Sequence, residues 1–404
     1  MRNTDWSKKI PQGAFVSKKP TYNVGEYFKF FKEDSAGGMK YYFFDPTEHG
    51  FEKGKTYPVF IFLHDYTNAL EGDVCINYSG AEFFAKEDYQ KSFGGAYILV
   101  PLANEKRNED GEVIDSWSET YANPLYDLIN EFIKKHADTN GGVSKKLLWG
   151  NSAGAAMTYL MGQKYPDFFN ILIPVGSDDI PSDSVIDLWD KNNVHLFFAM
   201  GKRDEFNDYE GVVVPRLPRL EKMKNSFIFT PDWVYNGDKG IASINFGTEM
   251  GQHCLVNPMA CNLMFDDGTC MDQRLPRGLT DWINSLYTNA ENLDYGFVWK
   301  ETGELIGSGG VYRPHEPRPE TWSIGYNIRS DMWGKGITTE AMIKILEHAR
   351  STRDVKEIAG TFAVENIGSR RVMEKLGMAY LEDTEYTKFD GSETFKAQTF
   401  FRKF

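Results

Sequence analysis

The sequence lacks any long hydrophobic run. None of its apolar stretches approaches the ~20 consecutive residues that a membrane-spanning helix needs. The basic N-terminus is not followed by an apolar segment, so no secretory signal is recognisable. We therefore expect a cytoplasmic protein that has no membrane partner.

Positive charge is also in short supply. Lysine and arginine together number 45 against 58 aspartates and glutamates, which gives a net charge of −13. A negative field repels the phosphate backbone of nucleic acids unless a local basic patch reverses it. We expect no nucleic-acid partner.

Cysteine is scarce as well. Only four cysteines are present, at positions 75, 254, 261 and 270, and no CxxC pair occurs. Cys261 and Cys270 are close enough in sequence to form a disulfide or to contribute to a metal site. The absence of a paired motif favours free thiols instead, and we expect no metal.

The length of 404 residues, at ~100 to 200 residues per domain, suggests two domains. Between residues 57 and 286, short apolar runs alternate with amphipathic stretches. This alternation predicts an α/β fold with a doubly wound, mostly parallel sheet that is buried on both faces. The predicted strands are 58–63, 96–100, 146–149, 171–175 and 195–200, with an antiparallel hairpin at 27–31 and 40–44, and helices at 124–136, 153–164 and 275–286.

The pattern changes after residue 287. Residues 288–294 are polar and aperiodic, which predicts a boundary between a first domain at 1–288 and a second domain at 289–404. The second domain carries 16 basic and 18 acidic side chains, so it is nearly neutral and leaves a charge of −11 to the first. It is expected to be a smaller α+β domain with a mixed sheet, with strands at 295–300, 305–312, 321–328 and 357–362 and helices at 338–350 and 367–376.

The run Gly150-Asn151-Ser152-Ala153-Gly154 matches the motif G-x-S-x-G. It stands between a predicted strand and a predicted helix, which is the context of a nucleophile elbow. In such an elbow the serine occupies a strained turn, and small neighbours allow the strand and the helix to pack closely. The helix N-terminus also offers backbone amides to an oxyanion. The motif therefore predicts a nucleophilic serine, although glycine and serine also occur together in ordinary loops.

A nucleophilic serine requires a histidine base and an orienting carboxylate, which follow in the order Ser, Asp, His in this type of fold. Asp204 comes directly after the predicted strand 195–200, at the edge of the sheet where such sites assemble. His253 stands in a glycine-bounded loop before the last helix of the domain. We predict catalytic roles for Ser152, Asp204 and His253. The alternative is that Asp204 only shapes a turn and that Asp208 is the carboxylate.

With these motifs, residues 25–287 resemble the α/β-hydrolase family, and more narrowly the esterases and peptidases related to polyhydroxybutyrate depolymerases and feruloyl esterases. The resemblance implies hydrolysis of a small-molecule ester or similar acyl bond, with the amides of Ala153 and Tyr66 as oxyanion donors. The family usually has His-Gly where this sequence has His64-Asp65. Asp65 then needs a backbone angle that glycine adopts easily, or the loop has a different shape.

In the second domain a strand leads through a glycine-containing turn into a helix, in the run Ile328-Arg-Ser-Asp-Met-Trp333-Gly334-Lys335-Gly336-Ile337-Thr338. The backbone amides and the helix dipole at such a turn suit a pyrophosphate. A second block, Asn366-Ile-Gly-Ser369, follows further along the chain. Together the two blocks resemble the GNAT acetyltransferases, in the branch similar to ribosomal-protein alanine and serine N-acetyltransferases.

This resemblance implies acetyl-CoA as the co-substrate and an amine as the acceptor. The residues expected around the cofactor are Ile328 beside the pantetheine, Trp333, Gly334, Lys335, Gly336, Ile337 and Thr338 at the pyrophosphate, and Asn366 and Ser369 near the thioester.

The second domain also departs from the family pattern. Ser323 stands where many relatives carry an acid, which leaves Glu320 as the candidate general base, and Met373 stands where other branches have a tyrosine. The first strand and helices of the GNAT fold are missing from 289–404. We expect a bifunctional enzyme, a serine esterase fused to an N-acetyltransferase. The alternative is an active esterase whose shortened second module only binds CoA or forms a homodimer.

Overall fold

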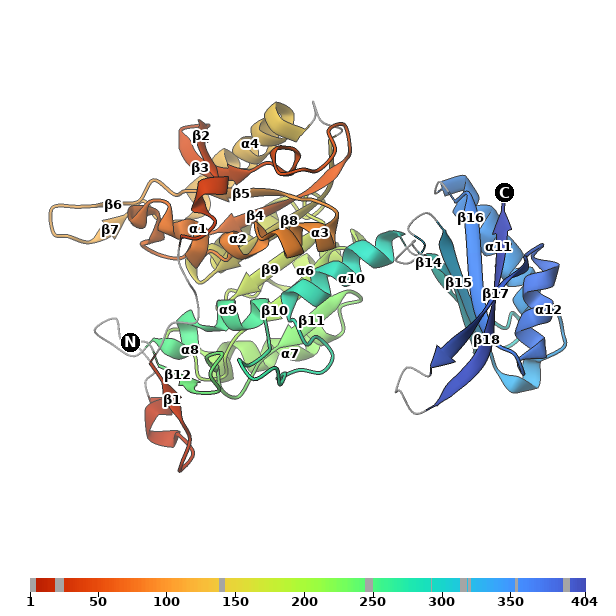
Figure 1. Cartoon of the computed structure of the whole chain (residues 1–404). Helices are drawn as coiled ribbons and strands as arrows, with labels where there is room; N and C mark the ends of the chain where they lie inside the picture. The colour runs from red at the N-terminus through yellow and green to blue at the C-terminus, as the bar shows by residue number, and fades with distance from the viewer. Residues whose placement is uncertain are drawn as a thin grey trace. The chain divides into compact units, whose positions relative to one another are not determined.

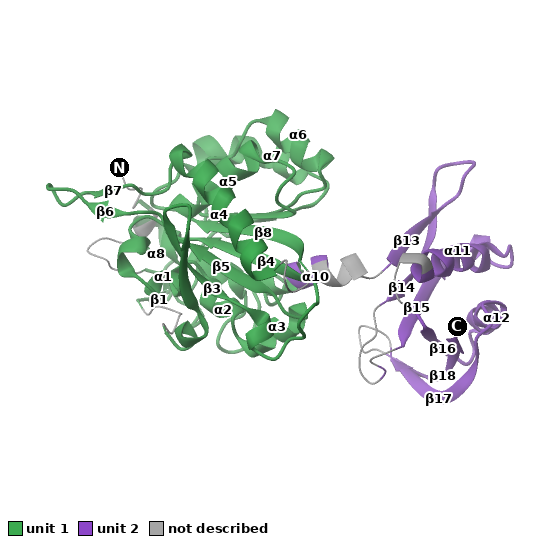
Figure 2. Cartoon of the chain, turned by 90° about the horizontal axis from the view of Figure 1, so that it is seen from above, with its two compact units in different colours: residues 1–282 green, residues 283–404 purple. Residues whose placement is uncertain are grey.

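The structure is a computed structural model that describes residues 5–18, 25–137, 142–243, 250–291, 293–312, 318, 321–352, 355–387 and 393–404. Contacts divide the chain into two compact units, Met1–Trp282 and Ile283–Phe404 (Figures 1 and 2). The division falls inside one helix, α10 (Leu279–Glu291). Within the described ranges, none of the helices has the length and apolarity needed to span a bilayer.

An eight-stranded sheet forms the centre of the first unit. Its strands are β2 (Lys32–Ala36), β3 (Met39–Phe44), β4 (Tyr57–Leu63), β5 (Tyr97–Pro101), β8 (Val143–Asn151), β9 (Ile171–Val175), β10 (His195–Ala199) and β11 (Ser226–Phe229). They lie in the order β11-β10-β9-β8-β4-β5-β3-β2. Only β3 is antiparallel to its neighbours β2 and β5, so the sheet is mostly parallel, as the sequence predicts.

Helices cover both faces of this sheet. They are α1 (Val74–Tyr78), α2 (Ala81–Phe84), α3 (Glu87–Phe93), α4 (Ala122–Phe132), α5 (Ala153–Lys164), α6 (Asp183–Lys191), α7 (Val214–Glu221), α8 (Gly251–Cys254) and α9 (Val256–Cys261), together with α10. Figure 2 shows α4, α5, α6 and α7 on one face and α1, α2 and α3 on the other. This is a doubly wound α/β fold, which confirms the predicted fold class.

Several short elements complete the first unit. Two small ladders pair β1 (Val16–Ser17) with β12 (Ile241–Ala242), and β6 (Lys106–Arg107) with β7 (Val113–Ile114). The short 3-10 and π turns are Asp5–Lys9, Phe28–Phe30, Pro46–Glu48, Asn68–Glu71, Glu119–Tyr121, Ile133–Ala137 and Tyr209–Val213.

The core lies around the central strands. Every residue of β4, β5 and β9 is buried, which explains why these strands appear in the sequence as continuous apolar runs rather than as alternating ones. Because β4, β8, β9 and β10 are parallel, the loops that follow them emerge at one edge of the sheet. That edge is where the residues of the predicted serine site lie.

The predicted first strand of the hairpin is wrong. Residues 27–31 contain a 3-10 turn, and the strand that pairs with β3 is β2. Ala36 is opposite Met39, so the connection has only two residues, Gly37 and Gly38, which both have positive φ (58° and 79°). A two-residue hairpin turn of this kind requires φ above zero at both positions, so the glycine pair fixes where the strands begin.

The predicted helix at 275–286 is shifted. Gly278 has a φ of 55°, which is not helical, and α10 begins at the next residue. The helix then continues to Glu291, through part of the polar segment predicted to be irregular. The prediction of thiols rather than a disulfide is confirmed, because none of the four cysteines, all of them described, is in a disulfide.

The second unit has a six-stranded mixed sheet. Its strands are β13 (Leu293–Val298), β14 (Leu305–Tyr312), β15 (Trp322–Ile328), β16 (Glu357–Ala363), β17 (Ala379–Thr387) and β18 (Thr394–Lys403). They lie in the order β13-β14-β15-β16-β18-β17, and only β15 and β16 are parallel. The helices α11 (Ile337–Thr352) and α12 (Ile367–Lys375) contribute Met342, Leu346 and Met373 to the core, and a 3-10 turn spans Ser330–Met332.

Candidate active sites

Ser152 lies at the turn between β8 and α5 with φ 53° and ψ −116°. This strained backbone conformation is tolerated because the two flanking glycines leave room for it. A Cβ on Gly150 would lie 1.9 Å from the carbonyl oxygen of Gly154, and a Cβ on Gly154 would lie 2.3 Å from that of Leu63. The G-x-S-x-G run therefore forms the tight strand-to-helix turn that its spacing predicts.

The structure brings the three predicted residues together in one hydrogen-bond chain. His253 Nε2 lies 2.9 Å from Ser152 Oγ, and His253 Nδ1 lies 2.7 Å from Asp204 Oδ2. Asp204 follows β10, while His253 lies in the one-turn helix α8 rather than in the predicted glycine-bounded loop. An imidazole that donates Nδ1–H to a carboxylate can accept the serine proton at Nε2.

The rival carboxylate lies elsewhere. Asp208 accepts a hydrogen bond from the amide of Gly211 at 2.9 Å and so caps the turn Tyr209–Val213. Asp204 Oδ1 instead accepts from the amides of Phe206 and Asn207 at 2.8 and 3.0 Å. These two amides orient the Asp204 carboxylate and leave Oδ2 to His253.

The electrostatics of the chain favour a charged aspartate beside the histidine. Burial alone raises the pKa of Asp204, but the adjacent His253 and the two backbone amides outweigh burial and leave the pKa lowered. Burial alone lowers the pKa of His253, but Asp204, with Asp65 and Glu205, outweighs it and leaves the pKa raised. The Asp204 carboxylate therefore stabilises an imidazolium as it forms.

Sequence reasoning missed Glu205, which is fully buried next to Asp204. Its Oε1 accepts from the amide of Gln252 at 3.1 Å and its Oε2 from the amide of His253 at 2.7 Å. Burial raises the pKa of Glu205 to about 7. Glu205 thus fixes the first turn of α8 and the backbone of His253. The only sequence signal is a second acid directly after Asp204.

Replacing Glu205 with glutamine should misplace His253. The amide side chain offers one oxygen and one NH2, so one of the two backbone amides faces a donor and loses about 1–3 kcal/mol. We expect kcat for ester hydrolysis to fall about tenfold with KM nearly unchanged. The exposed Glu210→Gln is the matched control. Loss of thermal stability with kcat intact would show that Glu205 is only structural.

The predicted oxyanion loop has its own shape. Asp65 is not among the residues with positive φ, and the left-handed residue is instead Thr67, at 76°. His64 holds the loop from inside: its Nδ1 lies 2.7 Å from the carbonyl oxygen of Asp65, and its Nε2 accepts from the amide of Ala103 at 3.0 Å. Burial lowers the pKa of His64, so a neutral ring donates at Nδ1 and accepts at Nε2.

The two predicted oxyanion donors lie at the same edge of the sheet. Ala153 is the first residue of α5, so its amide has no acceptor within the helix. Tyr66 follows β4, which is the neighbour of β8. The Tyr66 side chain is exposed and its hydroxyl donates to the carbonyl oxygen of Val113 at 3.0 Å, which leaves only its backbone amide for an oxyanion.

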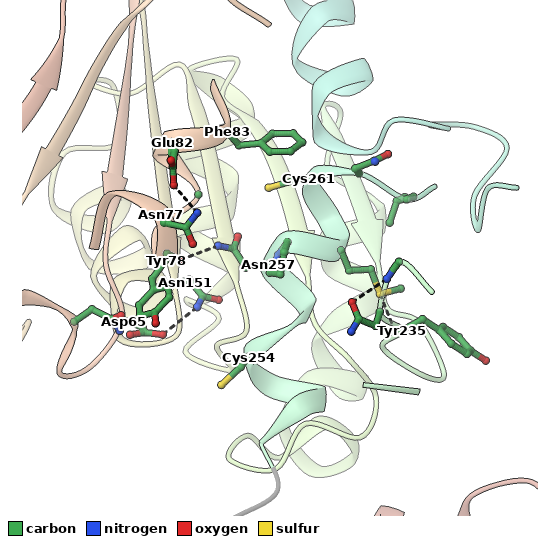
Figure 3. A pocket seen from close by; sticks show the side chains of 18 of the residues that line it. Asp65, Asn77, Tyr78, Glu82, Phe83, Asn151, Tyr235, Cys254, Asn257 and Cys261 are labelled. Atoms are coloured by element: carbon green, nitrogen blue, oxygen red, sulfur yellow. Dashed lines mark hydrogen bonds between the residues drawn. The ribbon is translucent and has the colours of Figure 1, made fainter. Parts of the chain in front are cut away.

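A pocket of about 680 Å³ adjoins this site (Figure 3). Asp65 and Tyr66 line it from the loop after β4, Asn151 lines it from the elbow, and Cys254 lines it from α8. Figure 3 shows Asp65 and Asn151 facing each other at one end of the pocket. The pocket is large enough for a small-molecule substrate.

In the second unit, the ladder between β15 and β16 is short. It joins only Trp322 to Ile358 and Ser323 to Ala359, although each strand has seven residues. The strands therefore separate towards Ile328. Across the separation, the hydroxyl of Tyr326 donates to the carbonyl oxygen of Ser369 at 3.0 Å.

The two blocks predicted to bind acetyl-CoA flank this separation. Trp333 is 69% exposed, and its Nε1 donates to the carbonyl oxygen of Ile328 at 3.1 Å. Asn366 caps α12, because its Oδ1 accepts from the amide of Ser369 at 3.0 Å. Met373 is buried in the core, and Glu320 lies outside the described residues.

Comparison with known proteins identifies this second unit. Residues 265–379 match the family model for the acetyltransferase (GNAT) domain. The uncharacterized protein YkkB of Bacillus subtilis is 30% identical over 130 residues, which are 29% of this chain and 73% of YkkB. The C-terminal part of the chain belongs to the GNAT acetyltransferase family. The matched residues include α10, which precedes the sheet of this GNAT domain.

Two solved structures resemble parts of the chain at a distance. A thermostable esterase is 16% identical with a TM-score of 0.40, and the match covers 58% of this chain and 60% of the esterase. The microcin self-immunity acetyltransferase MccE, solved in complex with acetyl-CoA and AMP, is 18% identical with a TM-score of 0.26 and covers 30% and 65%. Similarity at this level is too low to transfer any property to this chain.

GNAT acetyltransferases take their acetyl group from acetyl-CoA, and the turn predicted to receive its pyrophosphate, the GNAT cradle, lies between β15 and α11. Gly334 and Gly336 have φ of 74° and 78°, and a Cβ on either would have no atom within 4 Å. The space around the Cβ positions of both glycines is thus open, and α11 begins at the residue after Gly336, Ile337. The 16-residue helix adds its dipole at that end. Among the described residues, no group of three or more potential ligand side chains could hold a metal ion.

Proposed function

We propose that the first domain, at 1–288, is a serine hydrolase that cleaves an ester or similar acyl bond. The observation that carries this proposal is the hydrogen-bond chain from Ser152 through His253 to Asp204, with the serine on a strained elbow. The pocket beside the elbow supports a small-molecule substrate.

The geometry supports a two-step acyl transfer. Ser152 Oγ attacks the carbonyl carbon while His253 Nε2 takes its proton, and Asp204 stabilises the resulting imidazolium. The amides of Ala153 and Tyr66 donate to the oxyanion. His253 then protonates the departing alcohol, and water, deprotonated by the same nitrogen, releases the acyl group from Ser152.

A fluorophosphonate probe tests the nucleophile directly. The probe should label the intact protein at Ser152, as located by peptide mass spectrometry, because it reacts with activated serines rather than with ordinary ones. Prior treatment with heat or with denaturant should abolish labelling. Labelling at another serine, with Ser152 unmodified, would contradict the proposal.

For the second domain, at 289–404, the function best supported is transfer of an acetyl group from acetyl-CoA to an amine. Gly334, Lys335, Gly336 and the start of α11 would hold the pyrophosphate, and the separation between β15 and β16 would receive the pantetheine. The acceptor amine would attack the thioester carbon at the end of the separation near Ser369, and the leaving thiolate would take a proton.

Gly336→Val should weaken acetyl-CoA binding at least about tenfold, because a branched side chain at positive φ both strains the turn and covers its amides. Isothermal titration calorimetry on the full-length chain measures this. Gly303→Val is the matched control, since Gly303 also has a positive φ of 72° and open space around its Cβ position. Equal losses of acetyl-CoA affinity in the two variants, or no binding to the unmodified chain, would contradict an acetyl-CoA site at this turn.

A non-catalytic GNAT module remains the second candidate. Its support is the buried Met373, which can donate no proton, together with Ser323 in place of an acid. This module would bind CoA or pair with a second copy without transferring acetyl groups. Acetyl-CoA binding with no thiol release in the presence of a mixed set of primary amines would support it.

A further inference from the structure

The pocket in Figure 3 is lined by the chain neighbours of the two reacting residues, although neither Ser152 nor His253 lines it. Asn151, which lines it, directly precedes Ser152, and Cys254, which also lines it, directly follows His253. A substrate group bound at the Asn151 and Cys254 end of the pocket would therefore lie near the bond that Ser152 attacks. The chemistry of the lining indicates what that group is.

At the Asp65 end of the lining, three oxygen atoms are buried without any hydrogen-bond partner among the described residues. They are Oδ1 of Asp65, Oδ1 of Asn68 and Oδ1 of Asn151. Asn68 and Asn151 are only 7% and 3% exposed. Buried acceptors without donors are rare in folded proteins, because each forfeits its hydrogen bonds to water. A ligand that brings donors would satisfy them.

The three residues are also adjacent to one another. Asn151 Nδ2 donates to Asp65 Oδ2 at 3.4 Å, and the amide of Asn68 donates to the carbonyl oxygen of Asp65 at 3.4 Å. Asp65 is thus the centre of the group. All three free atoms are acceptors, which matches a ligand group with several donors and no acceptor.

The lining is strongly acidic. Its charged side chains are the five acids Glu26, Asp65, Glu71, Glu82 and Asp266 and a single base, Lys86. Lys86 Nζ lies over the rings of Phe83 and Tyr27, and no lysine or arginine forms an ion pair with Asp65 within the described ranges. Glu82 is already occupied, because it accepts from two backbone amides and from Asn77.

Among the described residues, no lysine or arginine serves as a counter-ion for Asp65. Burial raises its pKa to about 7, and only the nearby His253 and the amide of Asn151 oppose this. A cation in the pocket would stabilise the carboxylate form, as opposite charges do at short range. An uncharged group would not compensate the free energy that the carboxylate loses on burial.

We propose that the pocket binds a protonated primary amine of the substrate, with the Asp65 carboxylate as its counter-ion and the side-chain oxygens of Asn68 and Asn151 as further acceptors. An ammonium group has three N–H donors and no acceptor, whereas a hydroxyl has one donor. This inference rests on the proposed hydrolase function and narrows its substrates to esters or amides that carry an amine near the scissile bond.

Three p-nitrophenyl esters of equal length test the proposal on the full-length chain at about pH 7, where an alkylamine is protonated. They are the 6-aminohexanoate, the 6-hydroxyhexanoate and the heptanoate, in which an ammonium, a hydroxyl or a methyl group ends the acyl chain. We expect kcat/KM for the ammonium ester to exceed that of the other two by at least about tenfold. A heptanoate that reacts as fast, or a hydroxy ester that equals the ammonium ester, overturns the proposal.

The variant Asp65→Asn then tests whether Asp65 causes the preference for the ammonium ester. Since Asp65 lies in the loop that carries an oxyanion donor, absolute rates fall for every ester, and the readout is the ratio of ammonium ester to heptanoate. This ratio should fall at least about tenfold, while Asp110→Asn, on the exposed β6–β7 turn, should leave it unchanged. A ratio that Asp65→Asn does not change overturns the assignment.

The experiments distinguish failure of the amine pocket from failure of the proposed hydrolase function. If Ser152-dependent hydrolysis occurs with no preference for the ammonium ester, only the amine pocket is wrong. If none of the three esters is hydrolysed in a Ser152-dependent way, the proposed hydrolase is wrong and the amine pocket with it. Should Asp65→Asn fail to fold, the three-ester comparison on the unmodified chain still decides.

Discussion

Ser152→Ala is expected to lower kcat/KM for ester hydrolysis by at least about 10³-fold. The substitution removes the Oγ, which lies 2.9 Å from His253 Nε2 and is the atom whose proton this nitrogen would take. No covalent acyl intermediate can then form. Release of p-nitrophenol from a short-chain ester, measured at several enzyme concentrations, gives the value.

Two controls make this loss specific. Ser92→Ala removes an exposed hydroxyl that only donates to the carbonyl oxygen of Tyr89, so the rate should stay within about twofold, as for other surface substitutions. Acetyl-CoA binding to Ser152→Ala should be unchanged, because the GNAT cradle belongs to the other unit. Retained hydrolysis in Ser152→Ala would mean that another residue is the nucleophile.

The elbow could be predicted from the sequence because its cause is local. Gly150 and Gly154 are required by the close approach of backbone within a few residues, and such a requirement leaves a readable motif. The chain order then led to Asp204 and His253, which the structure brings together. The same logic applies to Gly37-Gly38, because a glycine pair with positive φ at both positions is a local signal for a two-residue turn and so for the ends of β2 and β3.

The sequence favours Asp204 as the orienting carboxylate but leaves Asp208 open as the alternative. Both follow β10 within a few residues, and either could reach the histidine from a flexible loop. The structure separates them by backbone hydrogen bonds: Asp208 caps a turn, whereas the amides of Phe206 and Asn207 hold Asp204. Such contacts depend on loop geometry, for which hydrophobic periodicity gives no signal.

The residues that line the pocket could not be predicted from the sequence either. Asp65 and Asn151 are 86 residues apart and meet only because β4 and β8 are neighbours. Their unpartnered oxygens become apparent only when every nearby donor is known. In the GNAT domain, the short β15–β16 ladder is likewise a property of packing, since both strands are apolar enough to predict full pairing.

Asp204→Asn should lower the plateau of kcat for ester hydrolysis by about 10³ to 10⁴-fold, because an asparagine favours the wrong imidazole tautomer. It should also shift the pH dependence. Hydrolysis needs neutral His253, whose pKa is raised above its usual value because Asp204, Asp65 and Glu205 outweigh burial. In the unmodified chain, the rate should therefore rise with pH through a midpoint above about 6.5.

In Asp204→Asn the burial that lowers the pKa of His253 remains, while the largest opposing charge is gone. The midpoint should therefore move to lower pH as the plateau falls. Asp208→Asn is the matched control, since asparagine can still cap the turn at Gly211 and the midpoint should stay in place. If Asp208→Asn moved the midpoint and Asp204→Asn did not, the orienting carboxylate would be Asp208, and the hydrogen bond between Asp204 and His253 would be structural.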